Sequence, residues 1–128
     1  MDKAYEGRFL YAAALPYTLA DASLVRELMH PEMGGPPPAS LAEVVVAPFG
    51  ETSAHVHPSS SHVIHVLEGR GSMRIENRIF PLETRDTVFV PAGAVHQVQN
   101  SGDCFLRFLC FFTPPHRHGD TSIIEEKP

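Results

Sequence analysis

Four histidines in the middle of the chain have the spacing of a metal site. His55 and His57 are one residue apart, so in an extended strand both imidazoles project from the same face while Val56 turns away. Residues 58–61 form a turn sequence that returns the chain to His62, which can supply a third nitrogen from the neighbouring strand. Two imidazoles on one face and a third beside them predict a bound metal ion.

A fourth imidazole follows a second turn sequence. Pro91, Ala92 and Gly93 predict a tight turn, and His96 begins a run in which apolar and polar residues alternate. Histidine is the commonest metal ligand and binds in its neutral form, so four imidazoles suit one divalent transition metal. Magnesium and calcium prefer oxygen ligands and do not fit this set. We therefore predict that His96 completes a site of four nitrogens.

The elements that must position these histidines are predicted to be β-strands. After Ala39 the chain has short runs rich in valine, isoleucine and phenylalanine, separated by proline, glycine and asparagine. This pattern is typical of an antiparallel sandwich or barrel, so the predicted fold class is all-β. Residues 23–28 are a further candidate element, interpreted as an edge strand rather than a short helix. The predicted strands are 41–47, 54–57, 62–68, 72–76, 87–90, 95–99 and 105–112.

A cluster of helix- and strand-breaking residues, Gly-Gly-Pro-Pro-Pro at 34–38, divides the chain. A chain of 128 residues is about the size of one domain and too short for two well-buried cores. We therefore predict an N-terminal arm and linker over residues 1–38, a single β-barrel over 39–114 and a C-terminal tail over 115–128.

Composition excludes several classes of function. Apolar residues make up 43% of the chain and charged residues 20%, which predicts a soluble globule, and a net charge of −5 offers no field that gathers nucleic acid or anionic membrane. Cys104 and Cys110, the two cysteines, lie too far apart along one extended strand to form a disulfide. Reduced thiols, no secretory signal and no apolar run of about 20 residues predict a cytoplasmic protein.

The stretch from Gly50 to Asn100 resembles the two sequence motifs of the cupin superfamily. Matches to the first motif are His55, His57, His62 and Gly69, and matches to the second are Pro91, Gly93, His96 and Asn100. The resemblance implies a small single-domain cupin of the conserved-barrel type, folded as a double-stranded β-helix or jelly-roll barrel. It also implies one metal ion, held by His55, His57, His62 and His96.

Three positions depart from the cupin pattern. Phe49 and Arg85 stand where the family has glycine, so the turns there must form without it. His62 stands in place of the family's glutamate, which exchanges an anionic oxygen ligand for a neutral nitrogen. Sites of four histidines resemble those of a minority of small bacterial cupins, and an ion held in one keeps its full positive charge.

The other histidines are interpreted as structural. His65 lies three residues after His62 and so faces the opposite side of the strand, where it serves packing or an interface. His116 and His118 repeat the one-residue spacing in a proline-rich polar segment without a third donor nearby, and are interpreted as solvated loop residues. His30 is interpreted as a turn residue, with the alternative that the arm folds over the barrel mouth.

The predicted inner faces of the strands are apolar. Candidates for the substrate pocket are Met73, Ile75, Phe89, Val98, Phe108 and Cys110. A buried free cysteine is most often a small hydrophobe, so we do not predict a nucleophile there. Residues 105–112 are apolar on both faces apart from Arg107, which favours a homodimer or cover by the arm.

The predicted site leaves several functions open. Four nitrogen ligands leave two positions of a six-coordinate ion, enough for a bidentate small-molecule substrate or for substrate and dioxygen. Manganese and iron are the first candidate metals, followed by nickel, cobalt, copper and zinc. An apolar wall with few bases favours a dioxygenase-like oxidoreductase acting on an apolar or enolic substrate. The alternatives are a redox-neutral isomerase, epimerase or decarboxylase and a non-catalytic binding module, and no catalytic residue is assigned.

Overall fold

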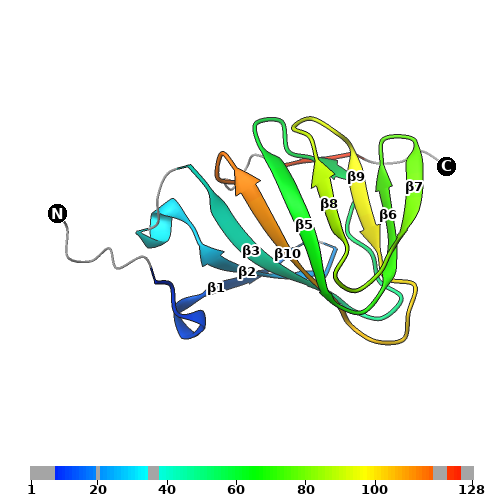
Figure 1. Cartoon of the computed structure of the whole chain (residues 1–128), viewed down its shortest axis with the longest axis horizontal. Helices are drawn as coiled ribbons and strands as arrows, with labels where there is room; N and C mark the ends of the chain where they lie inside the picture. Colours follow the sequence, from blue (N-terminus) through cyan, green and yellow to red (C-terminus); the bar gives the residue numbers. More distant parts are fainter. Residues whose placement is uncertain (1–7, 20, 35–37, 117–120, 125–128) are drawn as a thin grey trace.

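Two antiparallel sheets face each other and enclose the core (Figure 1). A computed structural model describes residues 8–19, 21–34, 38–116 and 121–124. The first sheet contains, in spatial order, β1 (Leu15–Thr18), β2 (Leu24–Met29), β3 (Ser40–Val46), β10 (Leu106–Thr113), β5 (Ser61–Glu68) and β8 (Thr87–Val90). The second contains β11 (Ser122–Ile123), β4 (His55–Val56), β9 (His96–Gln99), β6 (Gly71–Ile75) and β7 (Arg78–Leu82). Two short 3-10 turns, η1 (Tyr11–Ala13) and η2 (Pro31–Met33), precede β1 and β3.

The core lies between the sheets and is built by strand alternation. In β10 the inward side chains Leu106, Phe108, Cys110 and Phe112 are buried, whereas Phe111 between them is exposed. β10 pairs with β3 on one side and β5 on the other, so its inward row lies at the centre of the first sheet. The all-β class predicted from the sequence is confirmed by this arrangement.

Three strands were not among those predicted. β1 contains Pro16 and β7 contains Pro81, and proline lowers the expectation of a strand because it cannot donate to the ladder. Both strands lie at the edge of a sheet, where one side of the backbone needs no partner. The third, β11, has only two residues and is recognisable only from its pairing with β4.

The segment predicted as an N-terminal arm contains two strands of the first sheet. β2 pairs with β3 and β1 pairs with β2, so the sheet continues beyond the predicted barrel boundary at residue 39. Figure 1 shows β1 and β2 at the opposite end of the molecule from β6 and β7. Side chains from this segment therefore reach the space between the sheets.

Phe49 and Arg85, which stand where the cupin motifs have glycine, adopt a left-handed backbone conformation. Phe49 has φ 60° and Arg85 has φ 78°, a region that side chains other than glycine rarely occupy. The Arg85 N–H still donates to the Val66 carbonyl at 2.8 Å, so the turn before β8 forms without glycine. The glycine of the second motif's turn, Gly93, has φ 82° and its N–H donates to the His57 carbonyl at 3.0 Å.

The cysteines lie apart, as predicted. Both are free thiols, with Cys104 exposed and Cys110 buried in the core. In the described part of the chain, no helix has the length and apolar character needed to cross a membrane.

Candidate metal centre

Three imidazoles converge between the sheets. Ring nitrogens of His55, His57 and His96 all lie within 4.8 Å of one another, a spacing that could hold one metal ion. The ring centroids of His55 and His96 are 4.1 Å apart, and that of His57 lies 4.8 Å from His55 and 5.1 Å from His96. The short β4 brings this about, because His55 and His96 face each other directly across its pairing with β9.

Backbone carbonyls orient two of these rings. Nδ1 of His55 lies 2.5 Å from the Ser53 carbonyl oxygen, and Nδ1 of His96 lies 3.0 Å from the Ala94 carbonyl oxygen. A carbonyl oxygen only accepts, so each Nδ1 carries the proton and each Nε2 keeps its lone pair. Such a bond on the second ring nitrogen is the usual way in which proteins orient a metal-binding histidine.

His57 is positioned by the C-terminal segment. Its Nδ1 lies 3.1 Å from the hydroxyl oxygen of Thr121, immediately before β11. Because β11 pairs with β4, the strand that carries His55 is held between β11 and β9. The C-terminal segment thus closes one side of the histidine cluster.

His62 lies beside the cluster on the opposite sheet. Its ring centroid is 4.7 Å from that of His96 and 5.2 Å from that of His57, and its ring stacks on Phe112 at 4.8 Å. The group of mutually close ring nitrogens does not include His62. His62 is 2% exposed, and its Nδ1 finds no hydrogen-bond partner among the described residues. A buried polar atom without a partner costs free energy, which coordination of an ion would offset.

Burial favours the neutral form of His55, His62 and His96. It lowers the pKa of His62 to about 2, with further lowering by the charges of His96, His57 and other histidines nearby. Burial and the charge of His55 lower the pKa of His96 to about 4, although the bond to the Ala94 carbonyl opposes this. The pKa of His55 is also lowered by burial, against the opposing effects of Ser53 and Asp21. Neutral rings are the form that binds a metal.

The other histidines divide into two groups. His65 faces outward, where its Nδ1 lies 2.8 Å from the Thr87 hydroxyl, as strand alternation predicts. The interpretation of His116 as a solvated loop residue is wrong: its ring lies 4.7 Å from that of His57 and stacks on Phe112 at 5.0 Å. The cis bond between Thr113 and Pro114 follows β10, and the chain then brings His116 back over the site. His118 lies outside the described residues.

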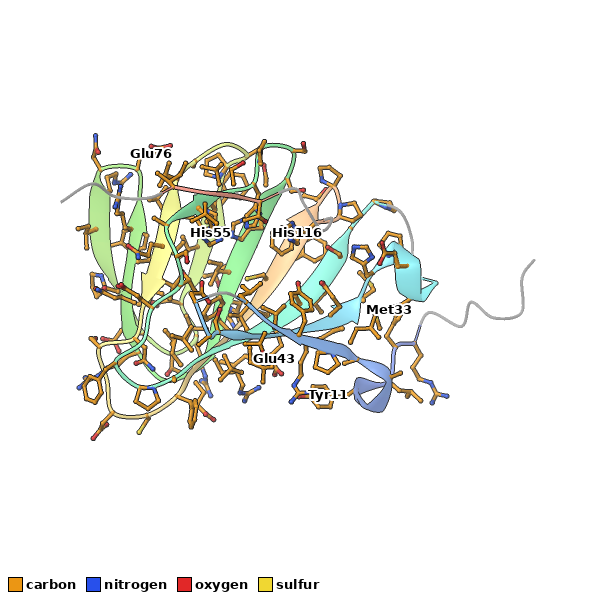
Figure 2. All side chains as sticks on the ribbon, turned by 180° about the vertical axis from the view of Figure 1, so that it is seen from behind. Tyr11, Met33, Glu43, His55, Glu76 and His116 are labelled. Atoms are coloured by element: carbon orange, nitrogen blue, oxygen red, sulfur yellow. The ribbon has the colours of Figure 1, made fainter. Side chains whose placement is uncertain are left out.

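The N-terminal segment contacts the residues near the site. His30 is 7% exposed, and its Nε2 lies 2.7 Å from the His116 carbonyl oxygen. Its Nδ1 accepts from the Glu32 N–H at 3.1 Å and caps η2, which agrees with the prediction of a turn residue. In Figure 2, His55 and His116 lie in the same half of the molecule, on segments far apart in the sequence.

A cavity of about 320 Å³ opens next to the histidines. Of the predicted wall residues, Val98, Phe108 and Cys110 line it. Met73 and Ile75 pack in or against the core but do not line the cavity, and Phe89 is 60% exposed. Phe89 pairs with Val63, and the adjacent pair, Val90 with His62, points inward. Because successive residues of a strand face opposite sides of the sheet, Phe89 faces solvent.

The cavity lining includes many residues that were not predicted from the sequence. Three polar ones come from the N-terminal segment and are Tyr17, Asp21 and Glu27. The strand interpretation of residues 23–28 contained a signal for Glu27, since alternation places Glu27 on the same face as Val25. For Tyr17 and Asp21 the sequence offered no signal, because β1 was not predicted and Asp21 lies in a loop.

Two acidic side chains, one at the cavity and one on the outer face of the first sheet, have structural partners. Asp21 accepts hydrogen bonds from the N–H and hydroxyl groups of Ser23 and from the Ser53 N–H at 2.7 Å. These bonds lower the pKa of Asp21, although burial alone would raise it. Glu43, on the outward face of β3, pairs with Arg107 at 3.0 Å. Asp21 therefore joins the N-terminal segment to the residues that orient His55.

Comparisons with known proteins identify a family and two relatives. The family model described as "Cupin domain" matches residues 42–112. The uncharacterized protein MJ1618 of Methanocaldococcus jannaschii is 37% identical over 115 residues, covering 90% of this chain and 92% of its own length. The tetracenomycin polyketide synthase protein TcmJ of Streptomyces glaucescens is 23% identical over 131 residues, covering 97% of this chain and 88% of its own.

A solved structure shows the same fold. The polyketide cyclase RemF from Streptomyces resistomycificus superposes with a TM-score of 0.75 at 21% identity, covering 94% of this chain and 86% of that chain. This likeness extends beyond the predicted barrel, because it covers a larger share of the chain than residues 39–114 make up.

Proposed function

This chain belongs to the cupin family, and on that premise we propose that it is a metal-dependent enzyme acting on a small oxygen-bearing substrate. The observation that carries the proposal is the convergence of His55, His57 and His96 at the wall of a cavity of about 320 Å³. We propose His62 as the fourth nitrogen. The ion is a divalent transition metal, with manganese or iron first and nickel, cobalt, copper or zinc as alternatives.

The residues present fit such an ion. The Nε2 lone pairs of His55 and His96 are left available by the carbonyl contacts at Nδ1, and burial keeps the rings neutral. The orphaned Nδ1 of His62 adds a buried nitrogen that an ion would satisfy. Four neutral nitrogens suit a transition metal and disfavour magnesium or calcium.

The cavity supports chemistry on a compact, partly apolar molecule. A divalent ion bound to the histidines would supply Lewis acidity toward a carbonyl, enol or phenol oxygen. The wall beside it is formed by Ile64, Val98 and Phe108, which exclude water from the apolar part of a substrate. Glu27 and Tyr17 add polar groups that the predicted apolar pocket did not contain.

Those polar groups favour a redox-neutral reaction over oxygenation. The preference for a dioxygenase rested on a pocket predicted to be apolar, and the polar side chains of Tyr17 and Glu27 in the cavity lining weaken that reason. Relatives in the comparison support the same choice, since one is named as a polyketide synthase protein and a structural neighbour as a polyketide cyclase. A dioxygenase remains the second candidate, supported by the neutral all-nitrogen set of His55, His57, His62 and His96.

The test has a binding part and a reaction part. Protein loaded with cobalt(II) is titrated with acetylacetone, a small enolic chelator, and the visible spectrum of the ion is followed. A spectral change that His96→Ala abolishes supports the site, whereas no change in the loaded protein contradicts it. Phenolic and diketone substrates are then screened under argon and in air: turnover under argon supports the redox-neutral reaction, and turnover that consumes oxygen overturns it in favour of the dioxygenase.

A further inference from the structure

The cavity has a second polar end. Glu27 on β2 and Tyr17 on β1 line the same cavity as the histidines, and Glu27 is 6% exposed. β1 and β2 form one side of the first sheet, and β2 lies three strand positions from β5, the strand that carries His62 (Figure 1). The wall between the two ends is apolar, with Val25, Val44, Ile64 and Phe108 among its residues.

Strand register places Glu27 on the inward face. Glu27 faces Ala42, Ala42 faces Cys110, and Cys110 faces Ile64, so these side chains form one row across the first sheet. Three intervals of about 4.8 Å separate β2 from β5, which puts roughly 14 Å of sheet between the backbones of Glu27 and Ile64. His62, two residues before Ile64, shares its inward face.

Tyr17 is placed to hold the Glu27 side chain. On β1, Leu15 faces Glu27, so Tyr17 two residues on lies on the same face, diagonal to Glu27. Burial, the charges of Glu27 and Cys110, and a side-chain hydrogen bond with Glu27 raise the pKa of Tyr17. Burial and the charge of Glu27 also raise the pKa of the Cys110 thiol.

A carboxylate in this position is costly to the fold. Transfer of a charged group out of water into an apolar wall is unfavourable unless hydrogen bonds compensate it. Asp21, the other acid at the cavity, is engaged by Ser23 and Ser53. Glu27 is an acidic group at the end of a ligand-sized cavity, three strand positions from the strand of His62, and has the character of a binding residue.

We propose that Glu27, oriented by Tyr17, is the second anchor of the cavity and accepts a hydrogen bond from a hydroxyl group of the ligand. This inference rests on the proposed function, because the other end of the ligand binds at the histidines. The ligand class is an elongated, largely apolar molecule, such as a polyhydroxylated aromatic compound, with chelating oxygens at one end and a hydroxyl at the other. The hydroxyl keeps its proton, so the step involves binding alone.

The test uses two catechols that differ by one group. Ethylcatechol and hydroxytyrosol share the chelating ring and the two-carbon chain, and only hydroxytyrosol carries a terminal hydroxyl. Both are titrated under argon into the full chain loaded with cobalt(II), with calorimetry and the visible spectrum as readouts. A buried hydrogen bond to a charged acceptor predicts that hydroxytyrosol binds roughly tenfold more tightly than ethylcatechol, or better.

Substitutions assign that advantage to Glu27. Glu27→Met has similar length without the charge, and it is expected to abolish the preference, so that hydroxytyrosol and ethylcatechol bind with equal affinity. Glu27→Gln keeps nearly the shape of the glutamate side chain and removes its charge, and it is expected to retain at most a few-fold preference for hydroxytyrosol. It is used in place of Glu27→Met if the methionine variant does not fold. Glu68→Gln, the same substitution on β5 outside the cavity lining, is the matched control and keeps the full preference.

The two possible failures are distinguishable. Equal affinity of the two catechols in the wild-type protein overturns the assignment of Glu27 and leaves the histidine site standing. A preference that persists in Glu27→Met overturns it in the same way. If neither catechol binds the loaded wild-type protein, chelation at the histidines is contradicted, and the proposed function fails with the inference that rests on it.

Discussion

Asn100 joins three segments next to the strand that carries His96, and its removal should cost a large part of the stability. Its Nδ2 donates to the carbonyls of Val46 at 3.1 Å, Ala47 at 3.1 Å and Cys104 at 2.8 Å. Its Oδ1 accepts from the Gly102 N–H at 3.0 Å, and the side chain is 2% exposed. Asn100→Ala removes all four contacts and supplies no replacement.

The expected magnitude follows from the buried groups left behind. A buried donor or acceptor without a partner costs about 1–3 kcal/mol, and water can reach some of these groups because three of the four bonds are only partly buried. We expect Asn100→Ala to lower the free energy of unfolding by about 3 kcal/mol. A domain of this kind has about 5–15 kcal/mol in total, so the variant should fold but unfold early.

Urea denaturation of chelator-treated protein measures this loss, followed by far-ultraviolet circular dichroism. At a slope of about 2 kcal/mol per molar urea, the midpoint should fall by roughly 1.5 M. Gln99→Ala is the matched control, since Gln99 is the exposed amide next in sequence and contacts Glu51 at 2.9 Å; it should cost less than about 0.5 kcal/mol. A loss below about 1 kcal/mol for Asn100→Ala would refute the reasoning.

Three further predictions concern stability. Gly71→Ala should cost about 3 kcal/mol or more, or prevent folding, because the added Cβ would lie 2.0 Å from the Gln99 carbonyl oxygen; normal unfolding by urea would contradict it. Arg85→Gly should stabilise the chain by about 0.5–1 kcal/mol, since relief of left-handed backbone exceeds the entropy of glycine, and an unchanged or lower melting temperature would count against this. In metal-free protein, His96 has a folded pKa of about 4 and His62 of about 2, below the ordinary 6.5, so the unfolded state binds more protons at acidic pH. Stability should therefore be full above pH 6.5 and fall progressively below it, through pH 4 and on toward pH 2, less steeply in His62→Leu; a flat profile would exclude buried neutral rings.

The strands that carry histidines were predictable because their pattern is local. Alternation places His55 and His57 on one face and turns His65 outward, and the structure agrees on both. Turns at Phe49 and Arg85 also followed from the motif positions, and the structure adds that their backbone is left-handed. Such features depend on a few neighbouring residues.

What could not be predicted depends on contacts between distant segments. His116 reaches His57 only because the chain after β10 turns back across the site and β11 pairs with β4. Glu27 reaches the cavity only because β2 adds to the edge of β3, a pairing that residues 23–28 do not specify. β1 and β7 were not predicted because each contains a proline. Proline is disfavoured inside a sheet, but it is tolerated in a strand at the edge.

The metal content of the purified protein tests the central claim most directly. Protein prepared without chelator is analysed by mass spectrometry of the elements, alongside His57→Ala, His96→Ala, His62→Ala and the outward-facing control His65→Ala. We predict about one transition-metal ion per chain in the wild-type protein and in His65→Ala, near-complete loss in His57→Ala and His96→Ala, and weaker retention in His62→Ala. Full occupancy in His96→Ala, or a wild-type protein that binds no transition metal even when it is supplied, would contradict it.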